Sequence, residues 1–319
     1  SSSGGSSSGG TTATSSSSGG SSNGGSSGGG SSSGGASSTT GGTQVSKSLS
    51  GDFTVKLTAA SDGTPAFTTF SGRANDGPTP PTIVLKVAAE SGDCKLSVPD
   101  APFCEKDCGQ GVCTAENTCT PYPQGQDLGP LVVKGIGPSP LPLTGTPPNF
   151  SYTSGAALPN PPCVEGADFS VEANGLSLTG KCIAPLSLKG ADPLPIATGK
   201  SLDLTWDPPK TPGQSRVEIY LDIAHHGGKK GQINCDVADT GSFSIPEPLV
   251  TQLINLGVAG FPTVQVTRAS TAVSSALPNV RLRMTSMVER SIDTGVASCS
   301  EDIPCPNGEM CRLSDYTCR

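Results

Sequence analysis

The chain has 319 residues, twelve cysteines and a formal net charge of −7 at pH 7. This acidic balance argues against nucleic acid as a partner, because phosphate binding needs lysines and arginines gathered on one face. No apolar run approaches the length of about 18 residues that a membrane-spanning helix needs, so none is predicted.

The amino-terminal stretch has the composition of a flexible linker. Residues 1–43 contain only Ser, Gly, Thr, Ala and one Asn, and cannot bury enough surface to offset chain entropy. Residues 1–44 are therefore predicted to be a disordered Ser/Gly-rich tether with a span of roughly 35 to 40 Å. Because the chain begins at Ser1 without Met, we expect a removed signal peptide and a lipid-modified cysteine before Ser1, anchored in the outer-membrane leaflet.

Alternating apolar and polar residues follow the tether and predict half-buried strands. Two such runs place on one face Phe53, Val55 and Leu57, and then Ile83, Leu85 and Val87. Residues 45–130 are expected to form an N-terminal β segment that includes a cysteine-rich module at 94–119. This module has too few apolar residues for a core, so disulfides must stabilise it.

Residues 131–298 carry further alternating strands and are expected to form a β-sandwich. The predicted strands lie at 131–136, 169–178 with a hairpin turn at Asn174-Gly175, 202–206, 217–223, 264–266 and 280–284. In the last of these, Val280, Leu282 and Met284 lie opposite Arg281 and Arg283.

One segment has helical spacing instead. Leu249, Val250, Leu253 and Ile254 recur at intervals of three and four, with Pro248 in the first turn and Gly257 as a left-handed cap. The predicted fold class is all-β: an antiparallel, Ig-like sandwich with one short helix and small disulfide-rich modules. Residues 299–319 form a C-terminal cysteine-rich knot, and whether the two β segments make one sandwich or two is open.

The twelve cysteines favour a disulfide framework over zinc sites, because only two histidines accompany them. They are Cys94, Cys104, Cys108, Cys113, Cys119, Cys163, Cys182, Cys235, Cys299, Cys305, Cys311 and Cys318. Four in the tail can close two bridges, whereas the first block holds five and the middle three. We therefore expect a bridge between these two groups: Cys163 pairs with Cys182, and Cys235 with a partner near Cys94. Disulfides imply an oxidising compartment outside the cytosol.

A repeated Asp-Thr-Gly raises the hypothesis of an aspartic peptidase, in which Asp239 and Asp293 share one proton. Such a pair needs carboxylates about 3 Å apart, each on its own rigid loop. The chain between them is too short for a second lobe of domain size. Since Asp and Gly are turn formers, both motifs are predicted to be turns.

No other motif predicts a catalytic, metal or cofactor site. His225 and His226 lie next to each other before Gly227, which favours a turn over a metal site. Asp222, Asp236 and Asp239 could offer oxygens to calcium, but solvated turns are the simpler interpretation. Trp206, on an alternating strand, is predicted to be core. Neither a G-x-S-x-G elbow nor H-E-x-x-H occurs.

Several segments together resemble uncharacterised predicted lipoproteins of myxobacteria and related Gram-negative bacteria. The most specific are PFCEKDCG in the first cysteine block and DTGSFSIPEPLV, and the resemblance covers most of the chain after Gln44. It implies an outer-membrane or cell-surface location and carries over no catalytic residues.

These features predict a non-enzymatic surface lipoprotein, secreted across the inner membrane, that acts as a binding or structural module. Its expected partner is an unknown envelope protein or glycan, and no cofactor is expected. The alternative is a secreted hydrolase of the aspartic-peptidase type at Asp239 and Asp293.

Overall fold

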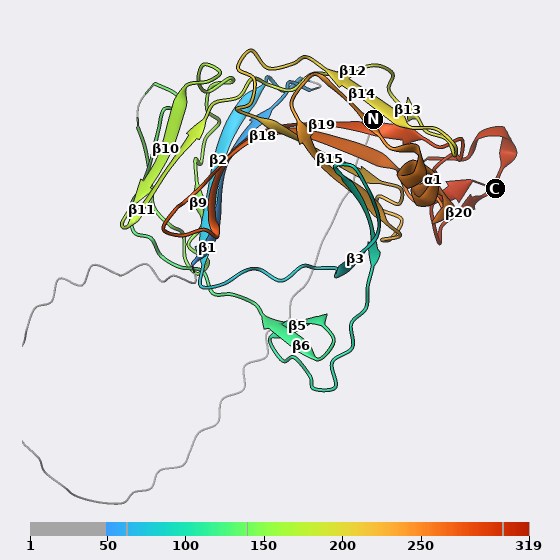
Figure 1. Cartoon of the computed structure of the whole chain (residues 1–319), viewed down its shortest axis with the longest axis horizontal. Coiled ribbons are helices and arrows are strands. Elements are labelled where there is room, and N and C mark those ends of the chain that lie inside the picture. Colours follow the sequence, from blue (N-terminus) through green and yellow to red (C-terminus); the bar gives the residue numbers. More distant parts are fainter. Residues whose placement is uncertain (1–48, 62, 139, 302, 319) are drawn as a thin grey trace, which may run out of the picture. The chain divides into compact units, whose positions relative to one another are not determined.

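The structure is a computed structural model that describes residues 49–61, 63–138, 140–301 and 303–318. The predicted tether at 1–44 lies outside these residues. Strands dominate the described chain, and Figure 1 shows them in several sheets. The predicted all-β sandwich with disulfide-rich modules and one short α-helix is confirmed.

The largest element is a ten-stranded sheet, which Figure 1 shows bent into an arc. Its strands follow one another in the order β3 (Leu85–Ser91), β4 (Cys94–Pro99), β16 (Gln232–Ala238), β15 (Arg216–Asp222), β18 (Thr263–Val273), β19 (Val280–Asp293), β1 (Ser50–Thr58), β2 (Phe67–Asn75) and β9 (Tyr152–Thr153), with β13 (Leu194–Pro195) paired to β19. Most neighbours are antiparallel, but β1 and β13 both run parallel to β19. Strands from the predicted segments 45–130 and 131–298 therefore share one sheet.

Two smaller sheets cover the outer side of this arc (Figure 1). One contains, in order, β11 (Leu176–Lys181), β10 (Asp168–Ala173), β7 (Leu131–Lys134) and β8 (Leu141–Leu143), and the other β12 (Leu188–Lys189), β14 (Leu202–Trp206) and β17 (Ser242–Ile245). Each small sheet buries an apolar face against the large one, which gives two separate hydrophobic cores. We call the core under β12, β14 and β17 the first core, and the core under β11, β10, β7 and β8 the second core. Trp206 is buried in the first core, as its strand pattern predicts.

The long strands β18 and β19 belong to both cores. Val264 and Val266 face the first core, whereas Leu282 and Met284 face the second. Between them, three inward-facing polar residues form what we call the polar seam: Arg268, Ser270 and Ser286. Their side chains hydrogen-bond the chain that crosses from β11 to β12, at Lys181 O, at Ala184 O and Pro185 O, and at Leu186 N. The seam thus satisfies backbone groups that two apolar cores could not.

The helix α1 (Glu247–Asn255) begins and ends as its sequence predicts. Pro248 lies in its first turn, Leu249, Val250 and Leu253 are buried, and Gly257 follows with a φ of 93°. The predicted hairpin also forms, with Gly175 at a φ of 74° between β10 and β11.

The prediction for Ile83 and Val87 is wrong in part, because both side chains are exposed rather than half-buried. The strand β3 begins only at Leu85 and lies at the edge of the sheet. An edge strand has a neighbour on one side only, so its apolar side chains stay partly in solvent, and a register shift between Val87 and Ala89 brings Ala89 against the first core instead.

All twelve cysteines are paired, and the expected bridges are confirmed. Cys94 joins Cys235 across β4 and β16, and Cys163 joins Cys182. The remaining pairs are Cys104–Cys113, Cys108–Cys119, Cys299–Cys311 and Cys305–Cys318.

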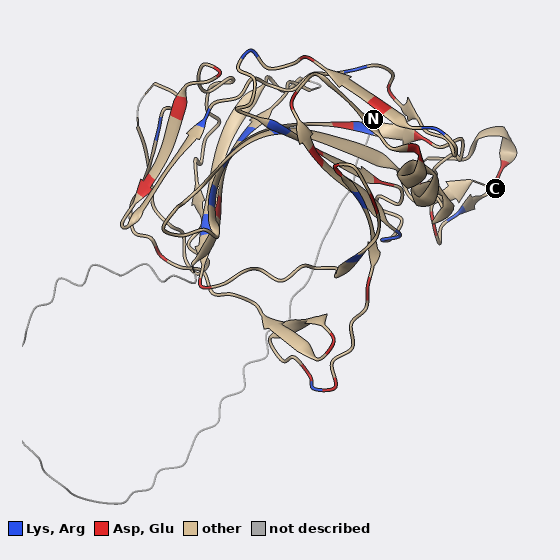
Figure 2. Ribbon diagram, in the orientation of Figure 1, with Lys and Arg blue, Asp and Glu red and all other residues tan. Residues whose placement is uncertain are grey.

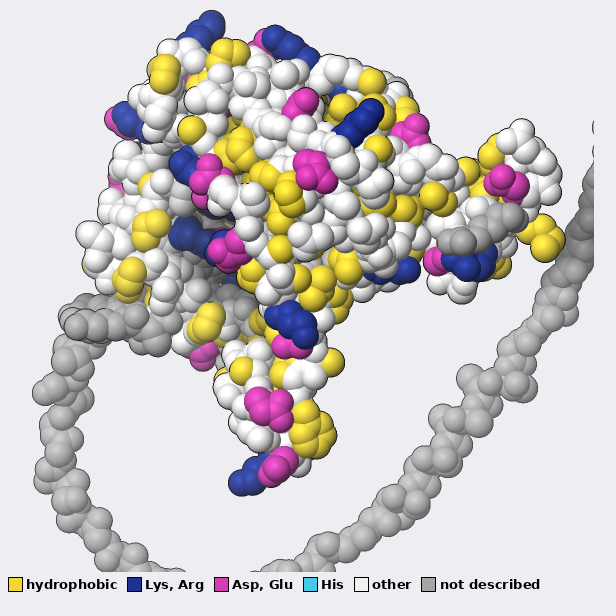
Figure 3. Space-filling view, turned by 45° about the vertical axis from the view of Figure 1, so that its right-hand side comes forward, with side chains coloured by type: hydrophobic (Ala, Val, Ile, Leu, Met, Phe, Trp, Pro, Cys, Tyr) yellow, Lys and Arg dark blue, Asp and Glu magenta, His cyan; other side chains and the backbone are white. Residues whose placement is uncertain are grey.

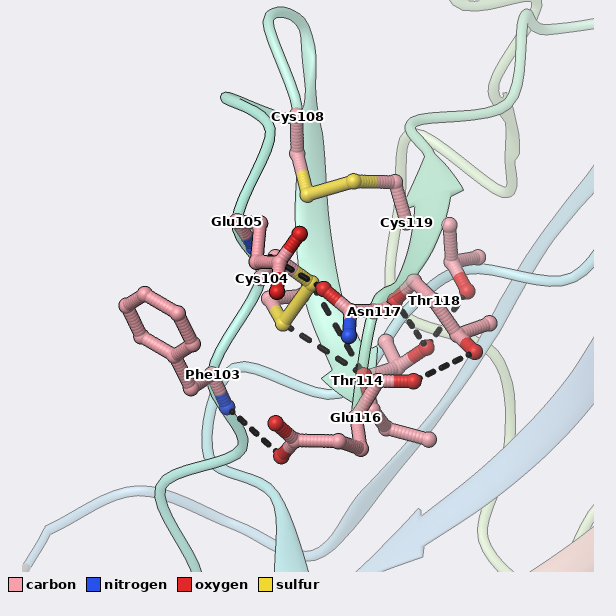
Figure 4. The surroundings of a disulfide bond; sticks show 12 residues. Phe103, Cys104, Glu105, Cys108, Thr114, Glu116, Asn117, Thr118 and Cys119 are labelled. Carbon is pink, nitrogen blue, oxygen red and sulfur yellow. Dashed lines mark hydrogen bonds between the residues drawn. A yellow bond between two sulfur atoms is a disulfide. The ribbon is translucent and has the colours of Figure 1, made fainter.

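The first cysteine-rich module is a small hairpin of β5 (Gly111–Ala115) and β6 (Thr118–Pro121), which pair with each other. Figure 4 shows how Glu116 and Asn117, in its turn, accept hydrogen bonds from the backbone of Phe103 and Glu105. The Phe103 ring extends away from these contacts and is 64% exposed.

The tail knot is built in the same way. It contains a short 3-10 helix (Pro306–Gly308) and the strands β20 (Cys311–Arg312) and β21 (Thr317–Cys318), which pair at Cys311 and Cys318. Its polar centre is Asp315, which accepts hydrogen bonds from Arg312 and Thr317. The Arg312 guanidinium lowers the pKa of the Asp315 carboxyl to about 2.

Phenylalanine rings cover glycines in neighbouring strands of the second core. Phe53 in β1 lies opposite Gly72 in β2, and Phe169 in β10 lies opposite Gly180 in β11. A Cβ at Gly72 would lie 2.2 Å from Cδ1 of Phe53, and one at Gly180 would lie 2.7 Å from Cε1 of Phe169. Both glycines are therefore required by the packing of a ring.

We expect Gly72→Ala to lower the free energy of unfolding by about 1 to 3 kcal/mol, because the new methyl group must displace the buried Phe53 ring. Chemical denaturation of the purified protein measures this change. Gly77→Ala is the matched control, since a Cβ there meets no atom within 4 Å. Equal stability of the two variants would contradict the proposed packing role.

Candidate functional site

The two Asp-Thr-Gly motifs do not meet. Asp239 follows β16 and is buried beneath Trp206 and Arg268, whereas Asp293 ends β19 and is exposed. The Arg268 partner of Asp239 pairs with Ser286, seven residues before Asp293 on β19. At about 3.3 Å per residue, this separates the two aspartates by roughly 20 Å.

Both motifs form turns, as predicted. Gly241 has a φ of 99° and Gly295 a φ of 74°, which glycine adopts readily. Asp293 accepts a hydrogen bond from Gly295 N at 2.8 Å, so its carboxylate stabilises its own turn.

The Asp239 carboxylate has four side-chain hydrogen bonds. Arg268 donates to both oxygens, at 2.6 and 3.1 Å, while Ser215 and Trp206 donate at 2.6 and 2.8 Å. Burial raises the pKa of Asp239, but the hydrogen bonds from Arg268, Ser215 and Trp206 outweigh burial and bring the pKa below its ordinary value. Asp239 is therefore an ionised structural anchor, and its lone pairs already have partners.

Three further residues that the sequence offers as ligands, Asp222, His225 and His226, lie at the end of β15 and in the turn after it, whereas Asp236 lies on β16 and pairs with Arg216. His225 and His226 are in the turn after β15, with ring centroids 4.0 Å apart. Nearby, Asp222 accepts hydrogen bonds from Tyr220 Oη and Ala224 N, and Lys229 Nζ lies 3.5 Å from Asp222. These contacts close the loop that follows β15, which is a structural role.

Three-residue groups that bring potential metal ligands together occur twice in the described chain, and both are cysteines. They are Cys104, Cys108 and Cys113, and Cys299, Cys305 and Cys311. Every one of these sulfurs is in a disulfide, so none offers the thiolate that zinc requires.

One surface that could bind a ligand is the inner side of the arc, which we call the concave face. It is formed by polar residues that alternate with the core residues of seven strands: Asp52, Thr54, Ser71, Arg73, Thr153, Arg216, Glu218, Asp236, Thr271, Arg281 and Arg283. Figure 2 shows basic and acidic residues on the strands along this inner side. The two cores lie on the other side of the sheet.

A first hollow in the concave face has a volume of about 390 Å³ and crosses β16, β15, β18 and β19. Ala269 and Thr271 of β18 lie between two sets of charged residues. On the β15 and β16 side, Arg216 contacts Asp236 at 2.6 Å. From the β19 side, Arg283 reaches over β18 to Glu218 of β15 at 2.6 Å. The small side chain of Ala269 leaves room for this crossing.

A second hollow of about 390 Å³ adjoins the first across β1, β2 and β9. Its lining is rich in hydroxyl groups, from Thr54, Ser71, Thr79, Ser151 and Thr153. The two hollows meet where Arg281 of the first contacts Asp52 of the second at 2.8 Å. We call these two neighbouring hollows together the groove, and in the view of Figure 3 basic and acidic side chains lie side by side around a hollow.

The sequence predicts this site only in part. The alternation of VRLRM places Arg281 and Arg283 on the polar face of their strand, and the structure agrees. That Asp52 lies beside Arg281 follows from the parallel pairing of β1 with β19, between residues 229 apart in sequence. The inward position of Arg268 has a sequence signal, since it continues the alternation of Val264 and Val266.

The fold and this groove define a two-core, all-β sandwich with an open polar face. No family model, curated protein or solved structure matches the chain. Among the described residues, no helix has the length and apolarity that a membrane crossing requires.

Proposed function

We propose that this protein is a non-enzymatic module of the cell surface or outer membrane that binds an extended polar polymer along the concave face. The observation that carries this proposal is the groove itself. It runs over seven strands from β16 to β9. At about 4.8 Å between strands, it is roughly 30 Å long.

The shape and lining of the groove favour a polymer over a small molecule. Small-molecule sites are enclosed and mostly apolar, with a few polar groups that fix orientation. Here the lining is dominated by charged and hydroxyl side chains on an open sheet. Such a surface offers many modest hydrogen bonds in a row, which suits a chain that contacts several of them at once.

The proposed location rests on the cysteines. Six bridges use all twelve of them, which is typical of proteins outside the reducing cytosol. A lipid anchor and a Ser/Gly tether, which the resemblance to predicted lipoproteins implies, would hold the groove away from the membrane. The engaged carboxylate of Asp239 lends no support to the alternative of an aspartic-type hydrolase.

Filling the groove tests the proposal. Thr271 is exposed in the first hollow, and we expect Thr271→Trp to weaken binding to a polysaccharide array at least tenfold, because the indole occupies the path of the polymer. Thr179→Trp is the matched control, since Thr179 is an exposed threonine on β11 of another sheet. Binding that both variants retain, or lack of binding by the full wild-type chain, would refute the groove as the site.

A further inference from the structure

Four arginines lie along the groove at regular places in the sheet. Arg281 and Arg283 are two residues apart on β19, and Arg281 lies in one row with Asp52 of β1 and Arg73 of β2. Arg216 lies on β15, opposite Ala269 of β18. With a strand spacing of about 4.8 Å and a rise of about 3.3 Å per residue, successive Cα atoms are roughly 7 to 12 Å apart. The guanidinium groups therefore follow the groove from one hollow to the other.

These arginines keep donors that no protein group uses. The Arg73 side chain has no hydrogen bond or ion pair within the described chain. Arg281 donates from Nε alone to Asp52. Arg283 donates from one terminal nitrogen to Glu218, while its Nε is buried without a partner. Because that Nε has no surface exposed to a ligand, Arg283 can bind an acceptor only through its terminal nitrogens.

The rest of the lining narrows the chemistry of the acceptor. The two linings contain four arginines and three acidic residues, Asp52, Glu218 and Asp236, so positive charge is in excess and an acidic ligand is favoured. The hydroxyl groups of the second hollow match the hydroxyl groups of a sugar. No described residue of either lining is aromatic, so the groove lacks the stacking platforms that favour neutral sugar rings.

Resting on the proposed function, we infer that the polymer is an acidic polysaccharide, whose carboxylates are bound by Arg73, Arg216, Arg281 and Arg283. Guanidinium groups bind carboxylates through paired, charge-assisted hydrogen bonds. The carboxylates that recur along the polymer can therefore take the place of Asp52, Glu218 and Asp236 as partners of the arginines. The acids Asp52 and Glu218 compete with the ligand and hold the arginines in place when it is absent.

The test compares polygalacturonate with its methyl ester, which has the same backbone without the charges. Titration calorimetry of the full chain is expected to show at least tenfold tighter binding of the acid, which weakens as salt is raised. Arg73→Gln, at an exposed and unpaired site, should reduce binding of the acid about tenfold, and Arg283→Gln should reduce it as well. Asp52→Asn should tighten binding, because it frees Arg281; a merely structural role for Asp52 predicts no gain.

Arg290→Gln is the matched control. Arg290 also lies on β19, pairs with Asp192 and has a buried Nε without a partner, but it faces the other side of the sheet. We expect it to bind polygalacturonate as the wild type does.

The outcomes separate this inference from the proposed function. Equal binding of acid and ester, lost in Thr271→Trp but kept in the arginine variants, would overturn the acidic ligand and leave the groove as the site. Binding of neither polymer would overturn both. Binding of polyglutamate with the same arginine dependence and greater strength would overturn the sugar and point to an acidic peptide.

Discussion

Replacing Asp239 with alanine is expected to lower the free energy of unfolding by about 3 to 5 kcal/mol, the usual cost of removing one partner of a buried ion pair. Arg268 is 2% exposed, and the change leaves its charge in the polar seam without a counter-ion. Trp206 and Ser215 also lose the acceptor of their buried hydrogen bonds. Denaturant titration followed by the fluorescence of Trp206 measures the loss.

The matched control is Asp236→Ala. Asp236 is three residues earlier in sequence and forms a similar 2.6 Å contact with Arg216, but both side chains are more than half exposed. Exposed pairs contribute about 1 kcal/mol or less, so this variant should unfold almost as the wild type does. Similar losses in both variants would refute the assignment of Asp239 as the buried anchor.

The same carboxylate predicts how stability depends on pH. Because its pKa is lower in the folded protein than in the unfolded chain, Asp239 contributes stability that is fully present above the ordinary carboxyl pKa of 3.8. This contribution is lost as the pH falls through the lower, folded pKa. We expect the stability of Asp239→Asn to change less than that of the wild type over this acidic window, as followed by thermal unfolding.

The seam explains why the chain needs a buried ion pair between two cores. The backbone that crosses from β11 to β12 passes over β18 and β19, where Arg268 donates to Ala184 O and Pro185 O, and the same guanidinium donates to Asp207 O just after β14. A guanidinium group has enough donors to satisfy all of these carbonyls and Asp239 at once. An apolar residue at 268 would remove these donors and leave the buried Asp239 carboxylate without its charged partner, which is costly.

The sequence predicts the local structure of this protein better than its assembly. Alternation in residues 53–57, 202–206 and 217–223 identifies strands, because each has one apolar face against a core. The helix follows from Leu249 and Leu253 at helical spacing. None of these patterns shows that β18 and β19 are shared by two cores. An alternating pattern predicts which side chains are buried, but it does not predict the sheet against which they pack.

For the candidate site, too, the sequence predicts the strand faces but not how distant strands come together. Arg281 and Arg283 are on a polar strand face by their alternation alone, and so is Asp52. The groove exists because β1 pairs in parallel with β19 and because the sheet bends, and both depend on contacts between distant parts of the chain. The disulfides are easier to predict, because an odd number of cysteines in two blocks requires a bridge between them.

Replacing Cys94 and Cys235 together by alanine is expected to lower the free energy of unfolding by about 4 kcal/mol. Their bridge closes a loop over a sequence separation of 141, and the entropy of so long an open loop in the unfolded chain gives about 5 kcal/mol. Three other bridges lie within the loop and shorten it, which lowers the expected value. Both cysteines are also buried in the first core, so alanine leaves small voids.

Hydrogen exchange should show which strands of the double alanine variant open first. β4 pairs with β3 on one side and is joined to the rest of the sheet only through β16. Without the bridge, we expect faster exchange in β3 and β4 than in β18 and β19, because an edge opens before the centre of a sheet.

Removing the Cys104–Cys113 bridge is the matched comparison, because its sequence separation is only nine and its hairpin pairs with itself. That double alanine variant should lose protection in β5 and β6 and keep the denaturation midpoint of the sandwich. If instead the short bridge proved the more costly to remove, the sandwich would depend on the module, and the long bridge could not be what holds the edge of the sheet to its centre.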